Sequence, residues 1–269
     1  MTKTTHFQDV DRGSDAADHV GYLDAVSANA AVARWKERSI DLLGLRAGDH
    51  ALEVGCGNGD EARAMAQRVA PGGTVTAIDI SEKMLEEARR RGTAGVTFVR
   101  MDAHELRFAD ESFDACRIER TLQHVDHPQR VVSELARVVR PGRRVVVMDP
   151  DWETLTVSAT DAGLTRRIVD HTADSPAHRH GRIGRRLAGL LVDAGLRVVA
   201  VEGALFTTGD FALADRLTNL TASAERAQEL GVVSASEAKT WLADLSDQGQ
   251  RGSLIVSLAG YTVVGEKPT

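Results

Sequence analysis

A glycine-rich loop flanked by acidic residues is the first feature of this chain that could bind a ligand. The segment Glu53-Val54-Gly55-Cys56-Gly57-Asn58-Gly59-Asp60 joins a short apolar run to a helix-forming run. Glycines let the backbone approach a ligand closely, and the N-terminus of a helix presents N–H groups without partners. The Gly-x-Gly-x-x-Gly pattern of a nicotinamide dinucleotide site is incomplete, because Asp60 takes the place of its third glycine. A carboxylate there repels a pyrophosphate, so the loop favours a ligand without phosphate, and a cationic one suits it.

Two further acids follow the next two predicted strands. Asp79 ends the second strand, 20 residues after Gly59, where a doubly wound sheet directs a side chain at a ribose. Asp102 ends the third strand and is followed by the small Ala103, an arrangement that suits the exocyclic amine of adenine. A single acid at a strand end is more often only solvated. Three acids beside one glycine loop favour an adenosyl ligand.

Histidines supply candidates for proton transfer. His124 follows the fourth predicted strand, with Gln123 beside it, and a histidine there can act as a general base. The alternative is that His124 only packs or forms a hydrogen bond. His171, His178 and His180 form a second group, which a polar loop would also explain.

Acids and arginines after the fifth predicted strand leave further alternatives open. Asp149 or Asp151 could serve as a base or as a magnesium ligand, but one carboxylate pair without a third oxygen ligand is a weak metal signal, and no metal is predicted. An arginine cluster could bind an anionic group of a substrate or form a solvated helix face. Its members are Arg179, Arg182, Arg185 and Arg186.

The elements that must position these residues alternate between strand and helix. Short apolar strands are predicted at about 50–54, 74–78, 96–99, 113–118 and 144–148, with further strands at 196–201 and 254–264. The runs between them are built from helix formers and end at proline or glycine. Strands that alternate with helices pair in parallel, so the fold class is α/β with a doubly wound sheet.

The second half of the chain departs from this rhythm. We predict one domain over 1–269, with a ligand-binding core at 36–150 and two helical inserts at about 151–180 and 207–250. Within the second insert, Gly231 is expected to separate two helices. A helix is predicted over 182–194, and a helix or helix pair over 21–43 is expected to fold over the first strand.

Composition excludes several classes of protein. The 269 residues are 42% hydrophobic and 27% charged, as in a globular protein, and the net charge of -6 disfavours binding to nucleic acid or to an anionic membrane. No apolar run is long enough for a membrane-spanning helix, and the polar start is unlike a secretory signal. Two cysteines without metal-type or redox-type spacing complete the expectation of a cytoplasmic protein.

These motifs together resemble the class I S-adenosylmethionine-dependent methyltransferases. The resemblance rests on the glycine loop, on Thr-Ala-Ile-Asp-Ile-Ser at 76–81, on Arg-Met-Asp-Ala at 100–103 and on the segments 112–125 and 135–147. It covers about 45–150 well and the rest loosely. It implies a Rossmann-like sheet of seven strands with the last one antiparallel, and S-adenosyl-L-methionine as the cofactor.

The resemblance also implies roles for individual residues. Gly55, Gly57 and Gly59 would line the methionine part of the cofactor, Asp79 would hold the ribose, and Asp102 the adenine amine. The remaining cofactor-binding residues that it implies are Arg34 on the cofactor carboxylate, Ile80 and Met84 near the adenine, Ala103 through its backbone N–H, and Glu119 and Arg120 near the methionine end.

Apolar residues in the inserts are expected to roof the site at the end of the sheet, where open α/β folds bind ligands. The sequence therefore predicts a methyltransferase (EC 2.1.1) that acts on an O or N atom of a small, partly apolar metabolite, of the secondary-metabolite type. Alternatives are a C-methyltransferase of a quinone-like or isoprenoid substrate, and an enzyme that uses the same cofactor pocket for cyclisation. The partner is a small molecule, and the oligomeric state stays open, with a homodimer among the options.

Overall fold

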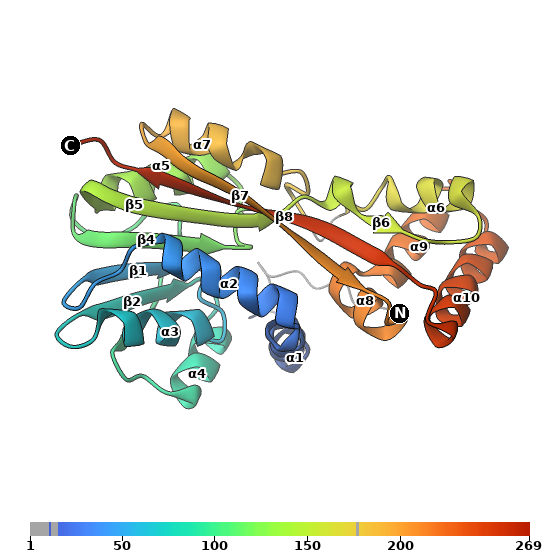
Figure 1. The fold of residues 1–269 in the computed structure, drawn as a ribbon, viewed down its shortest axis with the longest axis horizontal. Helices are drawn as coiled ribbons and strands as arrows, with labels where there is room; N and C mark the ends of the chain where they lie inside the picture. Colours follow the sequence, from blue (N-terminus) through green and yellow to red (C-terminus); the bar gives the residue numbers. More distant parts are fainter. Residues whose placement is uncertain (1–10, 12–15, 176–177) are drawn as a thin grey trace.

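The computed structural model describes residues 11, 16–175 and 178–269, and its centre is one mixed sheet (Figure 1). The strands β3 (Val96–Arg100), β2 (Thr74–Asp79), β1 (His50–Val54), β4 (Phe113–Glu119) and β5 (Val139–Pro150) lie in this order and pair in parallel. The last strand, β8 (Val256–Glu266), pairs antiparallel with β5 on one side and with β7 (Arg197–Thr208) on the other. All seven predicted strands are present, and the last is antiparallel as predicted.

An eighth strand was not predicted. β6 (Thr156–Val157) has only two residues, and it continues the β5 side of β8 past Pro150. Two residues carry no periodicity that a sequence pattern could reveal.

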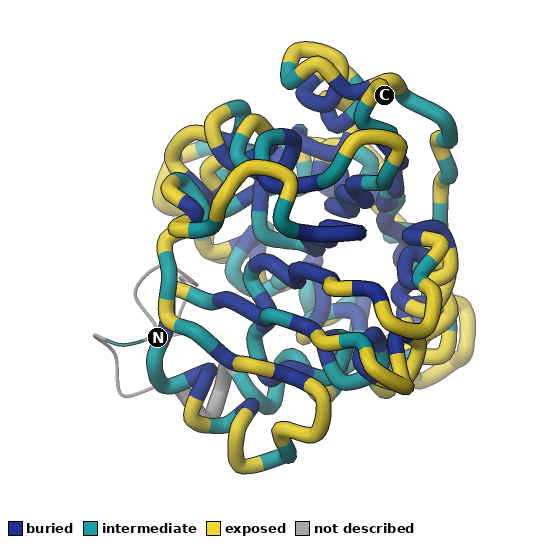
Figure 2. The backbone as a smooth tube through the Cα atoms, turned by 90° about the vertical axis from the view of Figure 1, so that its left-hand side faces the viewer, coloured by how far each residue is buried: buried dark blue, intermediate teal, exposed yellow. Residues whose placement is uncertain are grey.

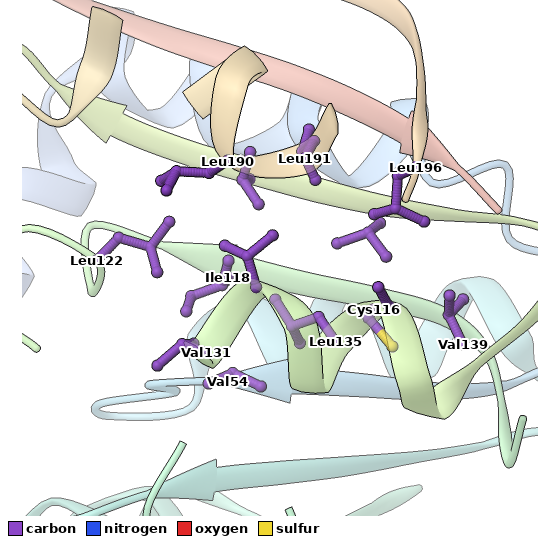
Figure 3. Close-up of a cluster of buried hydrophobic side chains, with 14 of the residues drawn as sticks. Val54, Cys116, Ile118, Leu122, Val131, Leu135, Val139, Leu190, Leu191 and Leu196 are labelled. Carbon is purple, nitrogen blue, oxygen red and sulfur yellow. The ribbon is translucent and has the colours of Figure 1, made fainter. Parts of the chain in front are cut away.

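Helices cover both faces of the sheet, and each face has its own core. α2 (Ala30–Leu42), α3 (Asp60–Val69) and α4 (Glu82–Arg91) pack on one face, through residues such as Ile40, Met65 and Leu85. α5 (Pro128–Val138) and α7 (Leu187–Asp193) pack on the other, where Leu135 and Leu191 meet Ile118 (Figure 3). Figure 2 shows buried stretches of the chain in the interior of the molecule and exposed stretches mainly at its periphery. The carboxyl ends of β1 to β5 are thereby held rigidly along one edge.

The N-terminal segment is a helix pair, one of the two arrangements expected. α1 (Ala16–Ala28) and α2 are joined at Asn29, whose side chain accepts from the backbone N–H groups of Ala31 and Val32 and so caps α2. α1 also contacts α8 (Phe211–Thr218) of the second insert. The pair therefore reaches from the sheet to the inserts.

The inserts form a helical unit beyond the end of the sheet, beside the extended halves of β7 and β8 (Figure 1). It contains α6 (Ala162–Val169), α8 (Phe211–Thr218), α9 (Leu220–Glu229) and α10 (Ala235–Arg251), preceded by the 3₁₀ turn η1 (Trp152–Thr154). These elements share a core around Ile168, Trp241 and Leu245. The second insert thus has three helices where two were predicted.

Asn219 explains the extra helix boundary. Its backbone is left-handed, with φ 53°, so it ends α8 and begins α9. Asparagine tolerates this conformation better than most residues, but Gly231 was the only break predicted in this insert. The helix predicted over 182–194 is instead a 3₁₀ turn, η2 (Gly184–Arg186), followed by α7.

No helix among the described residues is both long and apolar enough to cross a membrane.

Candidate functional site

The glycine loop lies at the carboxyl end of β1 and lines a cavity of about 450 Å³. Gly55 and Gly57 have left-handed backbones, with φ of 71° and 51°, which favour glycine. A Cβ atom on Gly55 would lie 2.1 Å from Oγ1 of Thr121. Both residues therefore need to be glycine for the loop to follow this path along the cavity wall.

Gly59 does not line the cavity. It is the N-cap of α3, with φ 77°, and a Cβ atom there would lie 2.8 Å from the ring of Phe98. The structure thus gives this glycine a packing role between α3 and β3, in place of the cofactor contact expected from the sequence.

Asp79 holds the glycine loop from the end of β2. Its Oδ2 accepts from the N–H of Gly57 at 2.9 Å, and its Oδ1 accepts from the N–H of Ser81 at 2.9 Å. Burial raises the pKa of this carboxyl, against the effect of these N–H groups. The side chains of Ile80 and Met84 line the cavity beside it, and Ile80 is 48% exposed. An apolar, open wall of this kind suits a flat ring.

Asp102 and Ala103 line the same cavity at the end of β3, and His104 accompanies them. Oδ1 of Asp102 accepts from the N–H of His104 at 2.8 Å and lies 2.6 Å from its Nδ1. Partial burial opposes ionisation, but these two contacts outweigh it and lower the pKa of Asp102. Sequence reasoning missed His104, although its position two residues after the acid is a spacing at which it can orient the carboxylate.

The third wall of the cavity contains a buried ion-pair network. Arg117 on β4 pairs through Nη1 with Glu53 at 2.5 Å and through Nη2 with Glu119 at 2.5 Å. Lys36 of α2 reaches the same place, with Nζ 2.8 Å from Glu61 and 3.6 Å from Glu119. Oε2 of Glu53 and Oε1 of Glu119 are buried without a hydrogen-bond partner among the described residues. Each of these oxygens can still accept a hydrogen bond from a ligand in the cavity.

Glu53 and Glu119 share Arg117, but their pKa values shift in opposite directions. Burial raises the pKa of Glu53 to about 8, because the charge of Arg117 compensates only part of the loss of solvation. Burial opposes ionisation of Glu119 too, but the charges of Lys36, Arg117 and Arg120 outweigh it and lower the pKa of Glu119 to about 2.

Glu53 should therefore make folding stability depend on pH. Between its ordinary pKa of 4.5 and about 8, folded Glu53 holds a proton that the unfolded chain releases, so the free energy of unfolding should fall as the pH rises through this window. Glu119 contributes to stability above pH 4.5 and loses that contribution only as the pH falls toward 2.

Replacement of Glu53 with glutamine tests this assignment. We expect the free energy of unfolding to fall by at least about 1 kcal/mol less between the two ends of this pH window in Glu53→Gln than in the wild type. Urea unfolding at both ends measures this, with Glu86→Gln on the exposed face of α4 as the control. An equal decline in both variants would contradict the assignment.

Lys36, and not Arg34 as predicted from the sequence, is the basic residue of α2 that lines the cofactor cavity. Arg34 is exposed on α2 and does not line the cavity, whereas Lys36 is buried and does. Residues two apart lie on nearly opposite faces of a helix, so only one of them can face the sheet. Val32 and Ile40 are buried on the side of Lys36, four residues away in either direction, and this helical phase was the signal that pointed to Lys36.

Arg120 lines both the cofactor cavity and a second cavity, whereas His124 lines the cofactor cavity only. His124 lines the first cavity at the end of β4, and its ring lies 6.3 Å from that of His178, measured between centroids. His178 is buried, stacks on Trp152 at 4.0 Å, and has its pKa lowered by burial to about 4. Trp152 Nε1 in turn donates to Gln123 Oε1 at 2.7 Å. This stack fixes the wall in front of His124.

The second cavity is smaller, about 70 Å³, and its lining is mainly apolar. It shares Tyr22, Arg120 and Gln123 with the cofactor cavity. The other walls come from α1, α2, β5, η1, β7, β8 and α8, and include Val32, Trp35, Pro150, Trp152, Leu205, Phe206 and Leu217. Trp35 closes it over Gly260, because a Cβ atom on this glycine would lie 2.1 Å from the indole. Most of the other apolar insert residues that were expected to roof the site pack in the insert core.

Three arginines of the cluster form ion pairs with acids of the chain, and Asp151 is one of these acids whereas Asp149 is not. Arg185 pairs with Asp151 and Glu153, and Arg182 pairs with Glu153 and Asp174. Asp149 is buried, accepts from the N–H of Leu122 at 3.2 Å, and has its pKa raised by burial. Within residues 16–175 and 178–269, no group of three or more candidate side chains could hold a metal ion.

Comparison with known proteins identifies the family. A family model described as a methyltransferase domain matches residues 52–147. The chain is also 31% identical over 226 residues to the ubiquinone/menaquinone biosynthesis C-methyltransferase UbiE of Ectopseudomonas mendocina (strain ymp), covering 73% of this chain and 88% of that protein. The chain belongs to the class I S-adenosylmethionine-dependent methyltransferases. S-adenosylmethionine is therefore its cofactor.

Two further likenesses extend over nearly the whole methyltransferase chain. An uncharacterized 37.1 kDa protein in transposon TN4556 of Streptomyces fradiae is 36% identical over 256 residues, covering 94% of this chain and 72% of that protein. The solved structure of the [4+2]-cyclase SpnF superposes with a TM-score of 0.58 at 21% identity, covering 99% of this chain and 97% of that one. The likeness to SpnF concerns the fold alone.

Proposed function

We propose that this methyltransferase transfers a methyl group to an O or N atom of a small, partly apolar acceptor. One observation carries the proposal: an apolar cavity shares Tyr22, Arg120 and Gln123 with the cofactor cavity, so an acceptor in the first can meet a methyl group in the second. In this proposal residues 1–269 form one domain, whose inserts and N-terminal helices close the acceptor side.

The residues around the large cavity fit S-adenosylmethionine. Asp79 would accept from the ribose hydroxyls and Asp102 from the adenine amine, beside Ile80, Met84 and Ala103. At the methionine end, the ionised carboxylate of Glu119 matches an ammonium group, and Lys36 matches a carboxylate. The volume of about 450 Å³ falls within the range of small-molecule sites.

The chain's own groups provide positioning and proton removal. When bound, the cofactor supplies a methyl group that its sulfonium already activates for in-line displacement. The protein holds the acceptor at attack distance in a site from which water is largely excluded. His124 is positioned to take a proton from an acceptor hydroxyl or ammonium group.

A carbon atom is the second candidate for the methylated position, and the likeness to UbiE, a C-methyltransferase by name, favours it. Loss of a proton from a phenol or enol produces an anion that can react at oxygen or at the neighbouring carbon. The same site, with His124 as base, therefore serves both outcomes.

The direct test is incubation of the protein with S-adenosylmethionine that carries a deuterated methyl group and with a cellular metabolite extract. Mass spectrometry should reveal one labelled product together with S-adenosylhomocysteine. A changed metabolite without the label and without S-adenosylhomocysteine would favour a non-methylating reaction such as cyclisation.

Filling the apolar cavity should stop methyl transfer without affecting the cofactor. Ala31 on α2 lines this cavity, so we expect Ala31→Phe to lower the labelled product by at least about tenfold while the affinity for S-adenosylhomocysteine changes less than about twofold. Ala33→Phe is the matched control, because Ala33 is exposed on the same helix. Equal activity in the two variants would place the acceptor elsewhere.

A further inference from the structure

Arg120 lies in an uncommon backbone conformation on the wall that the two cavities share. Its φ is 46°, left-handed, a region that residues with a side chain seldom adopt. Its N–H donates to the carbonyl of Met148 at 2.7 Å, and its carbonyl accepts from Nε2 of Gln123 at 3.3 Å. The backbone is thus fixed from both sides, and functional sites are where such conformations concentrate.

The guanidinium of Arg120 has hydrogen-bonding capacity to spare. Among the described residues its side chain donates one long hydrogen bond, from Nη1 to the hydroxyl of Tyr22 at 3.4 Å, and the ring of Tyr22 lies 5.7 Å away. Nε is buried without a hydrogen-bond partner, although Oε1 of Glu119 lies 3.3 Å from it. A guanidinium can donate five hydrogen bonds, and a buried charged group without partners is costly.

The surrounding acids are shared with other cations. Glu119 lies 3.3 Å from Nε of Arg120, but it also pairs with Arg117 at 2.5 Å and lies near Lys36. Glu53 pairs with Arg117, and Glu61 pairs with Lys36. The raised pKa of Glu53 means that this carboxyl carries a proton over much of the neutral range. The cluster then has more positive than negative charge, and an anion beside Arg120 would balance it.

The position of Arg120 separates it from the cofactor's own carboxylate. Lys36 lines the cofactor cavity but not the apolar cavity. Arg120 lines both, and in the apolar cavity it is accompanied by Val32, Pro150 and Trp152. We propose that Arg120 binds an oxyanion of the acceptor, which makes the acceptor an apolar molecule with a carboxylate or an ionised hydroxyl group. This inference rests on the proposed function, and it assigns Arg120 to the acceptor rather than to the cofactor.

Matched pairs of small probes test the inference on the full chain saturated with S-adenosylhomocysteine. Calorimetry compares 3-phenylpropanoate with 3-phenylpropanamide, and 4-nitrophenolate with 4-nitroanisole at a pH where the phenol is ionised. We expect an anion to bind at least about tenfold more tightly than its neutral partner, the range of a charge-assisted hydrogen bond. A preference in the first pair indicates a carboxylate, and one in the second an ionised hydroxyl. Equal affinities, or no binding by any probe, would overturn the proposal.

Variants then assign the preference to this side chain. Arg120→Met should reduce the ratio of anion to neutral affinity to about one, Arg120→Lys should restore part of it, and Arg166→Met on the exposed face of α6 should preserve it. The affinity for S-adenosylhomocysteine should stay within about twofold in all three. If Arg120→Met weakens S-adenosylhomocysteine by tenfold or more, Arg120 belongs to the cofactor site and the inference is wrong. Failure of the wild-type protein to bind S-adenosylhomocysteine would instead contradict the proposed function.

Discussion

Replacement of Asp79 with alanine is expected to weaken the binding of S-adenosylhomocysteine by about 100-fold or more. The change removes the acceptor proposed for two ribose hydroxyls, and each hydrogen bond to a charged group contributes about 1.5–3 kcal/mol. It also frees the N–H groups of Gly57 and Ser81, which Asp79 holds at 2.9 Å, so the glycine loop loses its anchor. Isothermal titration calorimetry measures the affinity, and circular dichroism reports whether the fold is intact.

Two comparison variants separate the causes of that loss. Asp79→Asn retains the shape and one acceptor oxygen but not the charge, so it should fall between wild type and Asp79→Ala. Asp193→Ala, at the exposed end of α7, should bind as the wild type does. Unchanged affinity in Asp79→Ala would remove the ribose assignment and, with it, the reading of the cavity.

The cofactor side of the site was largely accessible from the sequence, because sheet topology determines it. Asp79 and Asp102 come directly after predicted parallel strands, and the carboxyl ends of such strands meet along one edge. The structure places both acids on the wall of one cavity with Gly55 and Gly57. Alternation of strand and helix was sufficient for this prediction.

Residues of the N-terminal helix pair, which lies outside that alternation, were harder to predict. Arg34 was chosen by resemblance, whereas the buried face of α2, marked by Val32 and Ile40, selects Lys36. A buried lysine runs against residue-type preference, so composition alone pointed away from it.

The residues that line the apolar cavity could not be predicted from the sequence, because tertiary packing selects them and no local pattern encodes it. Leu205 and Phe206 reach the apolar cavity from β7, and Trp35 reaches it from α2 because Gly260 makes room for its ring. Leu164 and Ile168, equally apolar in the sequence, instead pack in the insert core. Only the three-dimensional arrangement separates the two sets.

Replacement of His124 with glutamine is expected to lower kcat by about 10²- to 10⁴-fold, the usual contribution of a positioned general base. Glutamine retains polarity and much of the side-chain volume but cannot accept a proton near neutral pH. Because His124 lines the cofactor cavity next to Gln123, which the apolar cavity shares, and is not one of the residues proposed to hold the cofactor, the affinity for S-adenosylhomocysteine should change less than about twofold. Steady-state kinetics with the labelled product as readout measures kcat.

Tyr22→Phe supplies the comparison that tests His124 as the base. Tyr22 is a second titratable side chain on the shared wall, and its hydroxyl also accepts from Arg120 at 3.4 Å. If His124 removes the proton, Tyr22→Phe should retain kcat within about tenfold, since the loss of one neutral hydrogen bond contributes about 1 kcal/mol. The opposite result, with His124→Gln fully active and Tyr22→Phe inactive, would transfer the role of base to Tyr22. Full activity in both variants would indicate an acceptor that reaches the site already ionised, the case in which the charge of Arg120 becomes the decisive feature of the acceptor side.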